Sequence, residues 1–444
     1  MAIQVTRTYV GDVQNHQQVQ SDLDSLGDAA SKIWNVARWT VDRVWEATGE
    51  IPDEGTLKAY MKAQHCWKNL NAFSSQKVIE ELSDAFQSWF DVRHKDETAN
   101  PPGYRKEYDT RPRSTVTFKD NGFKHDPKHN RVRLSKGANL KDGWGDFVLC
   151  EYDTRNDIDL STVDTVQNVR AVWNGEQWEV HFVVRETIET PDSPGKGVAG
   201  VDLGVSNIAA VAYPDEYVLY PGNTIKQDNH YFQRKEYNTE GENGPSQQAQ
   251  RLRQKRTRRE THFYHTLTKT IIEECVDRDV GTLVVGWPED VRSEDLGKTA
   301  NKWLHTWAFD RIYQYLAYKG ENHGIEVLKE NEWNTSKTCC KCGDTTDSNR
   351  VERGLYVCGS CELVANADCN GAENIRQKIT PNPSVDRSSG CLAQPSTYLF
   401  DRESGTVRPA RTGRVVDQQI SHLRYGKPRR SRRGGCHCLT YYLL

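Results

Sequence analysis

Two pairs of closely spaced cysteines are the clearest candidate metal ligands in this chain. Cys339 and Cys342 form one Cys-x-x-Cys pair, Cys358 and Cys361 form another, and the polar segment 343–357 separates them. Four thiolates at this spacing are typical of a tetrahedral zinc site. A pair of redox dithiols is the alternative, but a disulfide enzyme rarely repeats the motif in this way. We therefore expect a structural Zn²⁺ ion bound by these four residues.

Three neighbouring residues bear on that site. Cys340 lies inside the first pair and competes as a ligand, but the geometry of a tight metal-binding turn favours the outer two cysteines. Gly343 and Gly359 each stand beside a pair, where glycine permits such a turn.

Asp368 follows the second cysteine pair, in the motif NADCNGAENI at the start of a predicted helix. One interpretation is a helix N-cap, because aspartate accepts hydrogen bonds from the free backbone amides of a first turn. The other is a carboxylate delivered to a metal ion by a short segment anchored to the cysteine ribbon. Taken alone, the segment fits both interpretations equally.

Asp202 lies among small and β-branched residues in GVAGVDLGVSNIAAVA, residues 197–212, which reads as a central strand. An unpaired buried carboxylate is costly, so a metal ion or a fixed basic partner is expected beside it. A surface turn fits poorly because the flanking residues are apolar. Gly204 removes a side chain where a ligand could approach.

A third carboxylate is expected after the segment GTLVVGWPEDVR, residues 281–292, which reads as a strand ending in a loop with Glu289 and Asp290. Asp202, one of these two residues and Asp368 then stand at the ends of three elements. Carboxylates gathered around two Mg²⁺ ions about 4 Å apart activate water and stabilise the leaving oxygen of a phosphodiester. We therefore expect a catalytic Mg²⁺ site.

The segments that must position these residues divide into two halves. Residues 3–11 and 114–190 alternate like strands, with a hairpin turn at Asn174–Gly175, and indicate an antiparallel barrel or sandwich. A helical periodicity over about 18–93 indicates a small bundle inserted between them. After a linker at 191–197, strands and helices alternate, which predicts a mixed α/β sheet with helices packed against it.

The composition of the chain excludes a helical membrane protein. The chain is 36% hydrophobic and 27% charged with a net charge of −3, and no apolar run approaches the roughly 20 residues of a membrane helix. The start of the chain has no signal-peptide pattern, so we expect a cytoplasmic protein without a membrane partner. In a reducing compartment, the 12 cysteines favour metal binding over disulfides.

Positive charge is concentrated locally. The predicted helix over 226–278 contains six cations without an acid between them, and such a cluster favours phosphate contact over a merely solvated face. The basic loop 94–113 around Tyr104 fits a phosphate-binding track and a solvated loop equally. From about residue 380 the periodicity is lost, which predicts a disordered basic tail, and Cys436-His437-Cys438 is too short for a metal site. The six cations of the predicted helix over 226–278 are Arg251, Arg253, Lys255, Arg256, Arg258 and Arg259.

Together, GVDLGVSN, the cysteine ribbon and the closing NADCNGAENI resemble the TnpB/OrfB family, transposon-encoded proteins that are similar to type V CRISPR effectors. The resemblance covers residues 1 to about 380. It implies an α+β multidomain fold with four parts. These are a wedge-type β-barrel (1–17 and 97–190), a helical recognition insertion (18–96), an RNase H-like RuvC domain (197–334 and 365–379) and an inserted zinc ribbon (335–364). The basic tail (380–444) follows, outside the resemblance.

The resemblance implies RNA-guided, Mg²⁺-dependent cleavage of DNA near a transposon end, with a guide RNA derived from that end, and links the chain to transposition. Asp202 takes the first RuvC position and Asp368 the third. At the second position the family has Glu, or sometimes a neighbouring Asp, where this chain has Gly286–Trp287. Glu289 is the expected substitute.

Two other functions remain open. If the second carboxylate is missing, the same scaffold would be an RNA-guided DNA-binding regulator without nuclease activity. The segment around Asp202 also suits an actin-like ATP-binding protein, although the cysteine ribbon and the basic helix argue against it.

Overall fold

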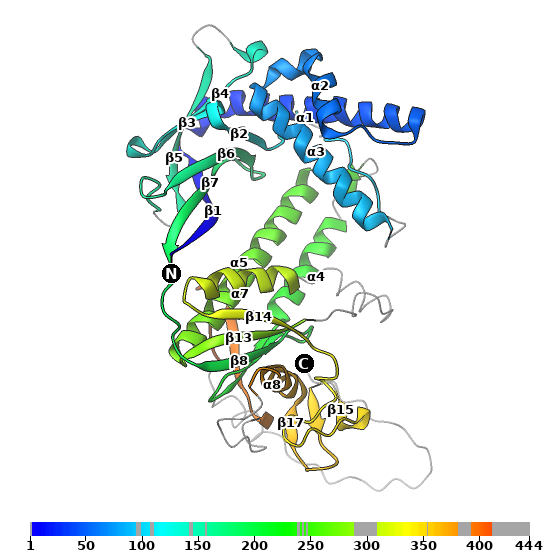
Figure 1. Cartoon of the computed structure of the whole chain (residues 1–444), viewed down its shortest axis with the longest axis vertical. Helices are drawn as coiled ribbons and strands as arrows, with labels where there is room; N and C mark the ends of the chain where they lie inside the picture. The colour runs from blue at the N-terminus through cyan, green and yellow to red at the C-terminus, as the bar shows by residue number, and fades with distance from the viewer. Residues whose placement is uncertain are drawn as a thin grey trace, which may run out of the picture.

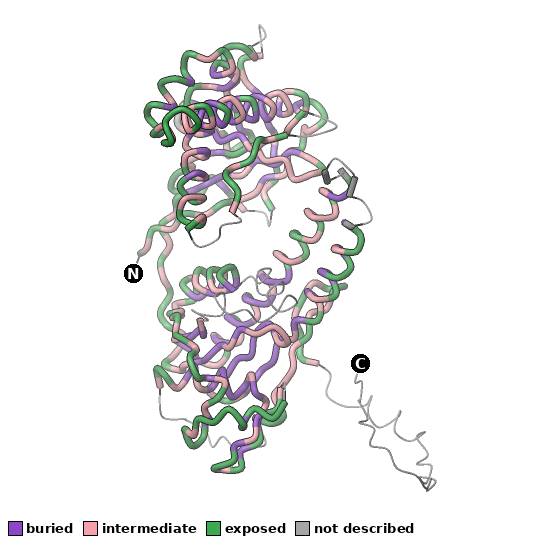
Figure 2. Tube along the Cα trace, turned by 90° about the vertical axis from the view of Figure 1, so that its right-hand side faces the viewer, coloured by how far each residue is buried: buried purple, intermediate pink, exposed green. Residues whose placement is uncertain are grey.

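The fold was analysed in a computed structural model (Figure 1) that describes residues 2–94, 99–106, 111–141, 145–155, 158–237, 240–241, 244–245, 247–287, 309–352, 354–380 and 392–410. Buried residues gather in two separate regions, one towards each end of the molecule (Figure 2). Residues between 13 and 184 form one of these regions, and residues between 199 and 392 form the other.

The N-terminal half contains a seven-stranded antiparallel sheet of order β2-β6-β7-β1-β5-β4-β3. Its edge strands, β2 and β3, follow each other in the chain with only the turn Asp120–Gly122 between them, so the sheet is nearly closed. The predicted hairpin joins β6 to β7, and Gly175 in its turn has a φ of 98°. The strands are β1 (Ala2–Val13), β2 (Val116–Lys119), β3 (Phe123–Asp126), β4 (Arg131–Ser135), β5 (Phe147–Thr154), β6 (Thr165–Trp173) and β7 (Trp178–Glu189).

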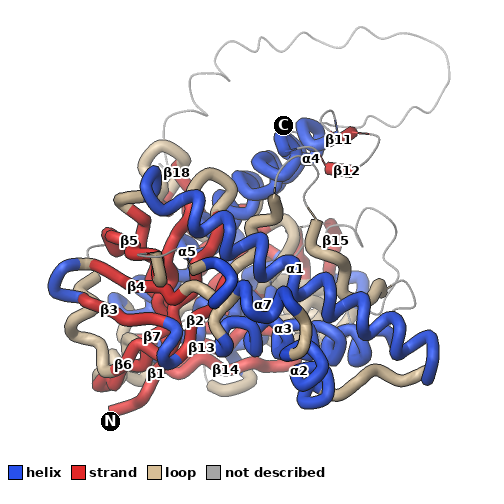
Figure 3. The backbone as a smooth tube through the Cα atoms, turned by 90° about the horizontal axis from the view of Figure 1, so that it is seen from above, coloured by secondary structure: helices blue, strands red, loops and turns tan. Residues whose placement is uncertain are grey.

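The helices inserted after β1 pack on this sheet and share its apolar core. The fully buried Trp178 of β7 donates its indole N–H to Asp24 of α1, at 2.8 Å. Viewed from above, the helices lie to one side of the strands (Figure 3). The helices are α1 (His16–Thr48), α2 (Glu54–Lys62) and α3 (Ala72–Arg93).

The C-terminal half is built on a second seven-stranded sheet, of order β14-β13-β8-β9-β10-β18-β19. Strands β8, β9 and β10 are antiparallel neighbours, whereas β13 runs parallel to both β8 and β14. This confirms the predicted mixed sheet. The strands are β8 (Gly197–Asp202), β9 (Asn207–Ala212), β10 (Tyr217–Pro221), β13 (Val280–Trp287), β14 (Glu326–Asn331), β18 (Ser396–Asp401) and β19 (Thr406–Pro409), and a separate short pair is β11 (Glu240–Gly241) with β12 (Gly244–Pro245).

The prediction of a disordered tail from residue 380 is wrong for β18 and β19. These strands form a hairpin, and β18 adds to the sheet as a parallel neighbour of β10. Phe400 packs against Phe263, with 5.2 Å between ring centroids, and Tyr398 against Tyr220, so the hairpin is anchored by aromatic contacts. The basic segment beyond residue 410, with Cys436-His437-Cys438, lies outside the described residues.

Helices cover both faces of the second sheet. Helices α5 and α7 pack on one face, and α8 with the cysteine ribbon packs on the other. Helix α8 approaches β8 closely because Gly200 has no side chain: a Cβ there would lie 2.2 Å from the carbonyl oxygen of Ala372. The helices are α4 (Asn223–Tyr237), α5 (Gln247–Asp277), α7 (Phe309–Glu321) and α8 (Ala367–Gln377).

Helices α4 and α5 extend from the second sheet towards the N-terminal half (Figure 1). Arg258 of α5 donates a 2.7 Å hydrogen bond to the carbonyl oxygen of Asn174, in the turn between β6 and β7. A Cβ on Gly175 in the same turn would collide with the side chain of Gln254. The φ of 98° at Gly175 favours glycine in this turn, and a larger residue would also require the Gln254 side chain to move. Among the helices of the described ranges, none has both the length and the apolar character needed to cross a membrane.

A buried ion pair within α8 supports a first prediction. Arg376 donates two hydrogen bonds to Glu373, at 2.9 and 2.8 Å, and their side chains are 3% and 0% exposed. Removing one charge leaves the other buried without compensation, which costs about 3–5 kcal/mol. Glu373→Gln is therefore expected to lower the free energy of unfolding by about 3 kcal/mol in urea titrations. Glu326→Gln, at an exposed position of β14, should change it by less than about 0.5 kcal/mol. An equal change in the free energy of unfolding in the two variants would contradict the prediction.

Candidate metal centres

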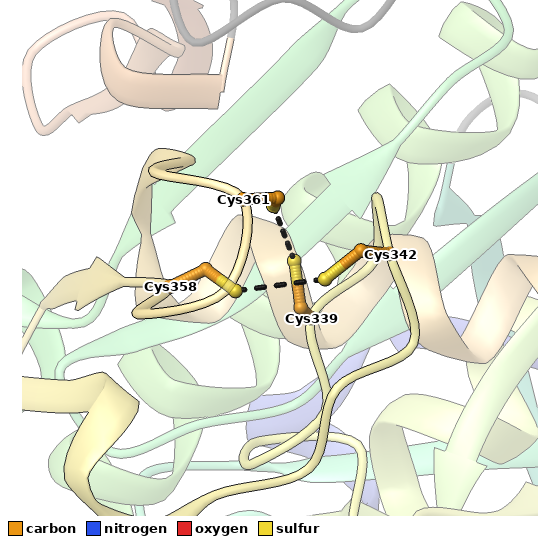
Figure 4. A group of neighbouring side chains, drawn as sticks. All are labelled: Cys339, Cys342, Cys358 and Cys361. Atoms are coloured by element: carbon orange, nitrogen blue, oxygen red, sulfur yellow. Dashed lines mark hydrogen bonds between the residues drawn. The ribbon is translucent and has the colours of Figure 1, made fainter.

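The four predicted zinc ligands come together at the tips of two turns (Figure 4). The Sγ atoms of Cys339 and Cys361 are 3.6 Å apart, those of Cys342 and Cys358 are also 3.6 Å apart, and all four lie within 4.8 Å of one another. A tetrahedral ion with Zn–S bonds of about 2.3 Å places its sulfurs about 3.8 Å apart. The cluster therefore has the donor set and the spacing of a zinc site.

The two turns have the same backbone design. The amide of Gly343 donates to the carbonyl of Cys339 at 2.8 Å, and the amide of Glu362 donates to the carbonyl of Cys358 at 3.0 Å. Gly343 has a φ of 77° and Glu362 a φ of 59°. The left-handed residue thus follows the second cysteine of each pair. In the second turn the left-handed conformation belongs to Glu362 and not to Gly359.

Backbone amides also stabilise thiolate charge in the second turn. Although burial raises the pKa of Cys358, hydrogen bonds from the amides of Cys361 and Ser360, together with those from the thiols of Cys342 and Cys361, lower the pKa to about 7. Cys340 stays outside the cluster, as predicted: its amide donates to the Asn370 side chain at 3.0 Å.

The ribbon that carries the cysteines is tied to α8. Its strands are β15 (Arg350–Glu352), β16 (Leu355–Val357) and β17 (Val364–Asn366). The side-chain amide of the fully buried Asn370 donates to the Thr338 carbonyl at 2.8 Å, and that of Asn374 donates to the carbonyls of Thr335 and Thr338, both at 2.7 Å. These contacts link the cysteine turns to the helix that carries Asp368.

Asp368 is not the N-cap of α8. The cap is Asn366, whose side-chain oxygen accepts hydrogen bonds from the amides of Asp368 and Cys369 at 3.0 and 3.2 Å. The Asp368 carboxylate instead accepts a 2.8 Å hydrogen bond from the side chain of Asn207, at the start of β9. Its other oxygen lies 4.0 Å from the guanidinium of Arg350, on the ribbon. The structure thus contradicts the capping interpretation.

The cap itself supports a second prediction. Asn366→Ala removes two hydrogen bonds at the start of α8 and is expected to cost about 1 kcal/mol of stability. Because Asp368 is in the first turn, the variant should also bind divalent ions more weakly, as measured by the rise in melting temperature on adding Mg²⁺. The matched control is Asn71→Ala, which removes the cap of α3 in the N-terminal half. If the rise in melting temperature on adding Mg²⁺ fell equally in both variants, the connection between the Asn366 cap and ion binding would be contradicted.

Asp202 is the last residue of β8 and lies against α8. A Cβ on Gly371 would be 2.4 Å from its Oδ2 atom, so glycine in α8 makes room for this carboxylate. Burial, then the negative charges of Asp368 and Glu332, raise the pKa of Asp202 well above its usual value, against the opposite effect of Arg350. The two carboxylates predicted at opposite ends of the domain sequence therefore converge.

The third predicted carboxylate has no described position. Strand β13 ends at Trp287, and both Glu289 and Asp290 lie outside the described residues. Among groups of three or more His, Cys, Asp or Glu residues in the described part of the chain, only the four cysteines have ligand atoms that all lie within 4.8 Å of one another. Glu289 remains a prediction.

Sequence reasoning missed the partners of the basic cluster on α5. Arg253 and Arg256 pair with Glu236 of α4 at 3.4 and 3.2 Å, and Arg259 pairs with Asp228 at 3.2 Å. Part of the cluster's charge is thus neutralised within the protein, and contact with phosphate remains a prediction. The acids lie on α4, where no local sequence pattern links them to these arginines.

The loop around Tyr104 is also anchored. Arg105 stacks on the ring of Trp34, with its guanidinium carbon 3.8 Å from the centroid, and pairs with Glu81 at 3.3 Å. The Tyr104 hydroxyl donates to Asp42 at 2.8 Å. Neither alternative for this loop anticipated that its basic and aromatic side chains pack on the helices.

Two family models match adjoining parts of the chain. The model described as "Probable transposase", OrfB_IS605, matches residues 181–292, which contain Asp202. The model described as "Cas12f1-like, TNB domain" matches residues 309–375, which contain the four cysteines and Asp368.

Curated relatives extend the similarity. The TnpB-like protein ORF457 of Acidianus two-tailed virus is 24% identical over an alignment of 398 residues, and the match covers 80% of this chain and 83% of that protein. The "Putative RNA-guided DNA endonuclease InsQ" of Escherichia coli (strain K12) is 24% identical over 68% of this chain and 72% of its own length. The endodeoxyribonuclease Cas12f1 of Sulfoacidibacillus thermotolerans is 31% identical over 111 residues, 25% of either chain.

Among solved structures, the Cas12f1-sgRNA-target DNA complex aligns with 84% of this chain and 100% of its own, at 15% identity and a TM-score of 0.36. That score is too low to support a conclusion, so the relationship rests on the sequence matches. Because these matches include both segments with the converging carboxylates and a TnpB-like protein along most of its length, the chain is a relative of the TnpB/OrfB proteins, as its motifs predict.

Proposed function

We propose that this chain is a transposon-associated, RNA-guided DNA endonuclease that hydrolyses phosphodiesters with two Mg²⁺ ions. The observation that carries the proposal is the convergence of Asp202 and Asp368 at one end of the second sheet. The printed names of two relatives, an RNA-guided DNA endonuclease and an endodeoxyribonuclease, support the same reaction. In this proposal the second sheet with α8 is the RuvC-like domain, the nearly closed sheet is the wedge domain, and α1–α3 form the recognition insertion.

The residues present fit a magnesium site. Mg²⁺ prefers carboxylate oxygens, and it would relieve the repulsion between two acids that burial brings together. Within the described part of the chain, no hydrogen bond reaches the Asp202 carboxylate, which leaves its oxygens available. Bound Mg²⁺ would supply Lewis-acid polarisation and an activated water.

The protein's own side chains orient this site. Asn207 holds one oxygen of Asp368 by its 2.8 Å hydrogen bond and so fixes the plane of the carboxylate. Arg350 places a positive charge beside the same group, where it would attract a phosphate of the substrate. Since Arg350 belongs to the ribbon, the structural Zn²⁺ would keep that charge in position.

Nucleic-acid binding is supported by a groove beside α5. A cavity of about 280 Å³ is lined by three arginines and by Asp228, which pairs with two of them, Arg259 at 3.2 Å and Arg402 at 2.9 Å. The third arginine is Arg258, and His262, Phe263, Phe400 and Thr224 complete the lining. Arginines with aromatic side chains suit a phosphate backbone and stacked bases. Helix α5 reaches both halves of the molecule, so a strand bound here would follow the connection between them.

A regulator that binds DNA without cutting it is the second candidate, and one observation favours it. Gly286 occupies the position where the family has a glutamate, so strand β13 lacks that ligand. Metal binding and turnover would fall if no other carboxylate replaced it.

The deciding experiment sequences the RNA that co-purifies with the full-length protein and then tests matching DNA for cuts. The nuclease proposal expects a transposon-end RNA and Mg²⁺-dependent cleavage of the matching DNA. Binding of that DNA without cleavage would favour the regulator. Absence of bound RNA would contradict both, and tight ATP binding would revive the actin-like alternative.

A further inference from the structure

The position beside Asp202 on the neighbouring strand has no side chain. Strands β8 and β13 run parallel with Val201 opposite Val285, so Gly286 lies beside Asp202 at the same level of the sheet. Neighbouring residues at one level direct their side chains to the same face. That face is the one covered by α8, because a Cβ on Gly286 would lie 2.5 Å from Cδ1 of Ile375.

The next strand supplies a carboxylate to this space. Strand β14 runs parallel to β13 with Glu330 opposite Gly286, and Glu332 follows two residues later, on the same side by alternation. A Cβ on Gly286 would lie 3.4 Å from Oε2 of Glu332. The Glu332 side chain therefore turns back towards Gly286, where its carboxylate would be in van der Waals contact with a Cβ, while Ile375 of α8 fills the rest of the space.

The backbone of Glu332 is held in place from α8. Its carbonyl oxygen accepts hydrogen bonds from the amide and the hydroxyl of Thr335, at 3.1 and 2.7 Å. The carbonyl of Thr335 in turn accepts a 2.7 Å hydrogen bond from Asn374 of α8. The turn after β14 is thus fixed to the helix that carries Asp368.

The Glu332 carboxylate has few neighbours that neutralise it. Its charge acts on Asp202, and Lys378 is the cation that acts on Glu332 itself. The Lys378 ammonium, however, donates to the carbonyl oxygen of Asn331. Over the described ranges, no side chain is found hydrogen-bonded to the Glu332 carboxylate. An acid in this setting has the chemistry of a ligand for a divalent cation.

We propose that Glu332, rather than Glu289, is the third carboxylate of the Mg²⁺ site, directed from the end of β14 towards Gly286. The inference rests on the proposed function, since it presumes that Asp202 and Asp368 bind divalent ions. The three carboxylates do not share the close spacing of the cysteine cluster. Two ions about 4 Å apart distribute their ligands over a wider space than one ion does, so a two-ion site does not require that close spacing.

The test compares Glu332→Gln with two matched variants, Glu289→Gln and Glu326→Gln, in full-length protein with its bound RNA. The readouts are Mn²⁺ binding, followed by electron paramagnetic resonance, and the rise in melting temperature caused by Mg²⁺. Losing even a residue that only supports a metal ligand weakens binding about 10–100-fold. Glu332→Gln should therefore weaken Mn²⁺ binding at least about tenfold, whereas both other variants should bind as the unmodified protein does.

Folding of the variant is checked separately. Without metal, Glu332→Gln should melt at or above the temperature of the unmodified protein, because one of three like charges is gone. Weakened Mn²⁺ binding in Glu289→Gln with unchanged binding in Glu332→Gln would overturn the proposal. If Asp202→Asn left Mn²⁺ binding unchanged, the proposed function itself would fail, and with it any role for Glu332 as a ligand.

Discussion

Replacing Asp202 with asparagine is expected to abolish Mg²⁺-dependent DNA cleavage and, without metal, to make the protein more stable. Cleavage should fall about 1,000-fold or more, since loss of a metal ligand removes at least about 4 kcal/mol of transition-state stabilisation. Stability should rise because burial and the charge of Asp368 raise the pKa of Asp202, which means that its ionised form destabilises the folded state. The uncharged amide removes that penalty.

The sign of the pH dependence follows from the direction of that pKa shift. With a raised pKa, the folded state holds a proton that the unfolded chain has released, so the contribution of Asp202 to stability falls as pH rises. The loss begins near the usual value of about 3.9 and is complete above the raised value. The stability advantage of Asp202→Asn should therefore grow from about pH 4 upward in metal-free protein.

The measurements are DNA cleavage, bound RNA and melting temperature with and without Mg²⁺. Asp84→Asn, at an exposed site on α3, is the control and should match the unmodified protein in all of them. Asp202→Asn should keep its RNA and lose the stabilisation by Mg²⁺. Unchanged cleavage would remove Asp202 from the mechanism. A lower melting temperature without metal would mean that the carboxylate has a stabilising partner rather than a repulsive one.

The site residues that could be predicted from the sequence are those marked by a pattern of residues close to them in the chain. The cysteine spacing is readable because each pair forms one turn, and the cluster in the structure contains the four predicted residues. Asp202 was recognisable because a charged residue among apolar strand residues is costly without a partner. Asp368 could be named but not interpreted, because Asn366 two residues earlier is an equally good cap in sequence terms.

The residues that sequence reasoning missed depend on contacts between distant strands. Glu332 lies in a charged segment that reads as an exposed strand end, and its significance comes from the register of β14 against β13 and from the absent side chain of Gly286. Asn207 is an ordinary turn residue until β9 is placed beside α8. The hairpin of β18 and β19 was missed for the same reason, since its alternating segment is short and pairs with β10 only in the folded chain.

Cys339→Ser is expected to remove the zinc ion and to destabilise the C-terminal half by several kcal/mol. Structural zinc contributes roughly 10 kcal/mol or more in small zinc-binding peptides, because the ligands are not preassembled in the unfolded chain. Part of that amount should remain here, since the ribbon also packs on α8 through Asn370 and Asn374. Zinc content by atomic absorption and the melting temperature both measure the effect.

Cys340→Ser is the matched control, because Cys340 is adjacent in the chain and buried but lies outside the sulfur cluster. It should keep its zinc, whereas full zinc occupancy in Cys339→Ser would mean that the ligand set is wrong.

The same pair of variants tests the link between the two metal centres. Asn370 and Asn374 tie the ribbon to the helix of Asp368, and Arg350 lies on the ribbon itself. Zinc loss should therefore weaken Mn²⁺ binding at the carboxylates, although none of the four cysteines would contact that ion.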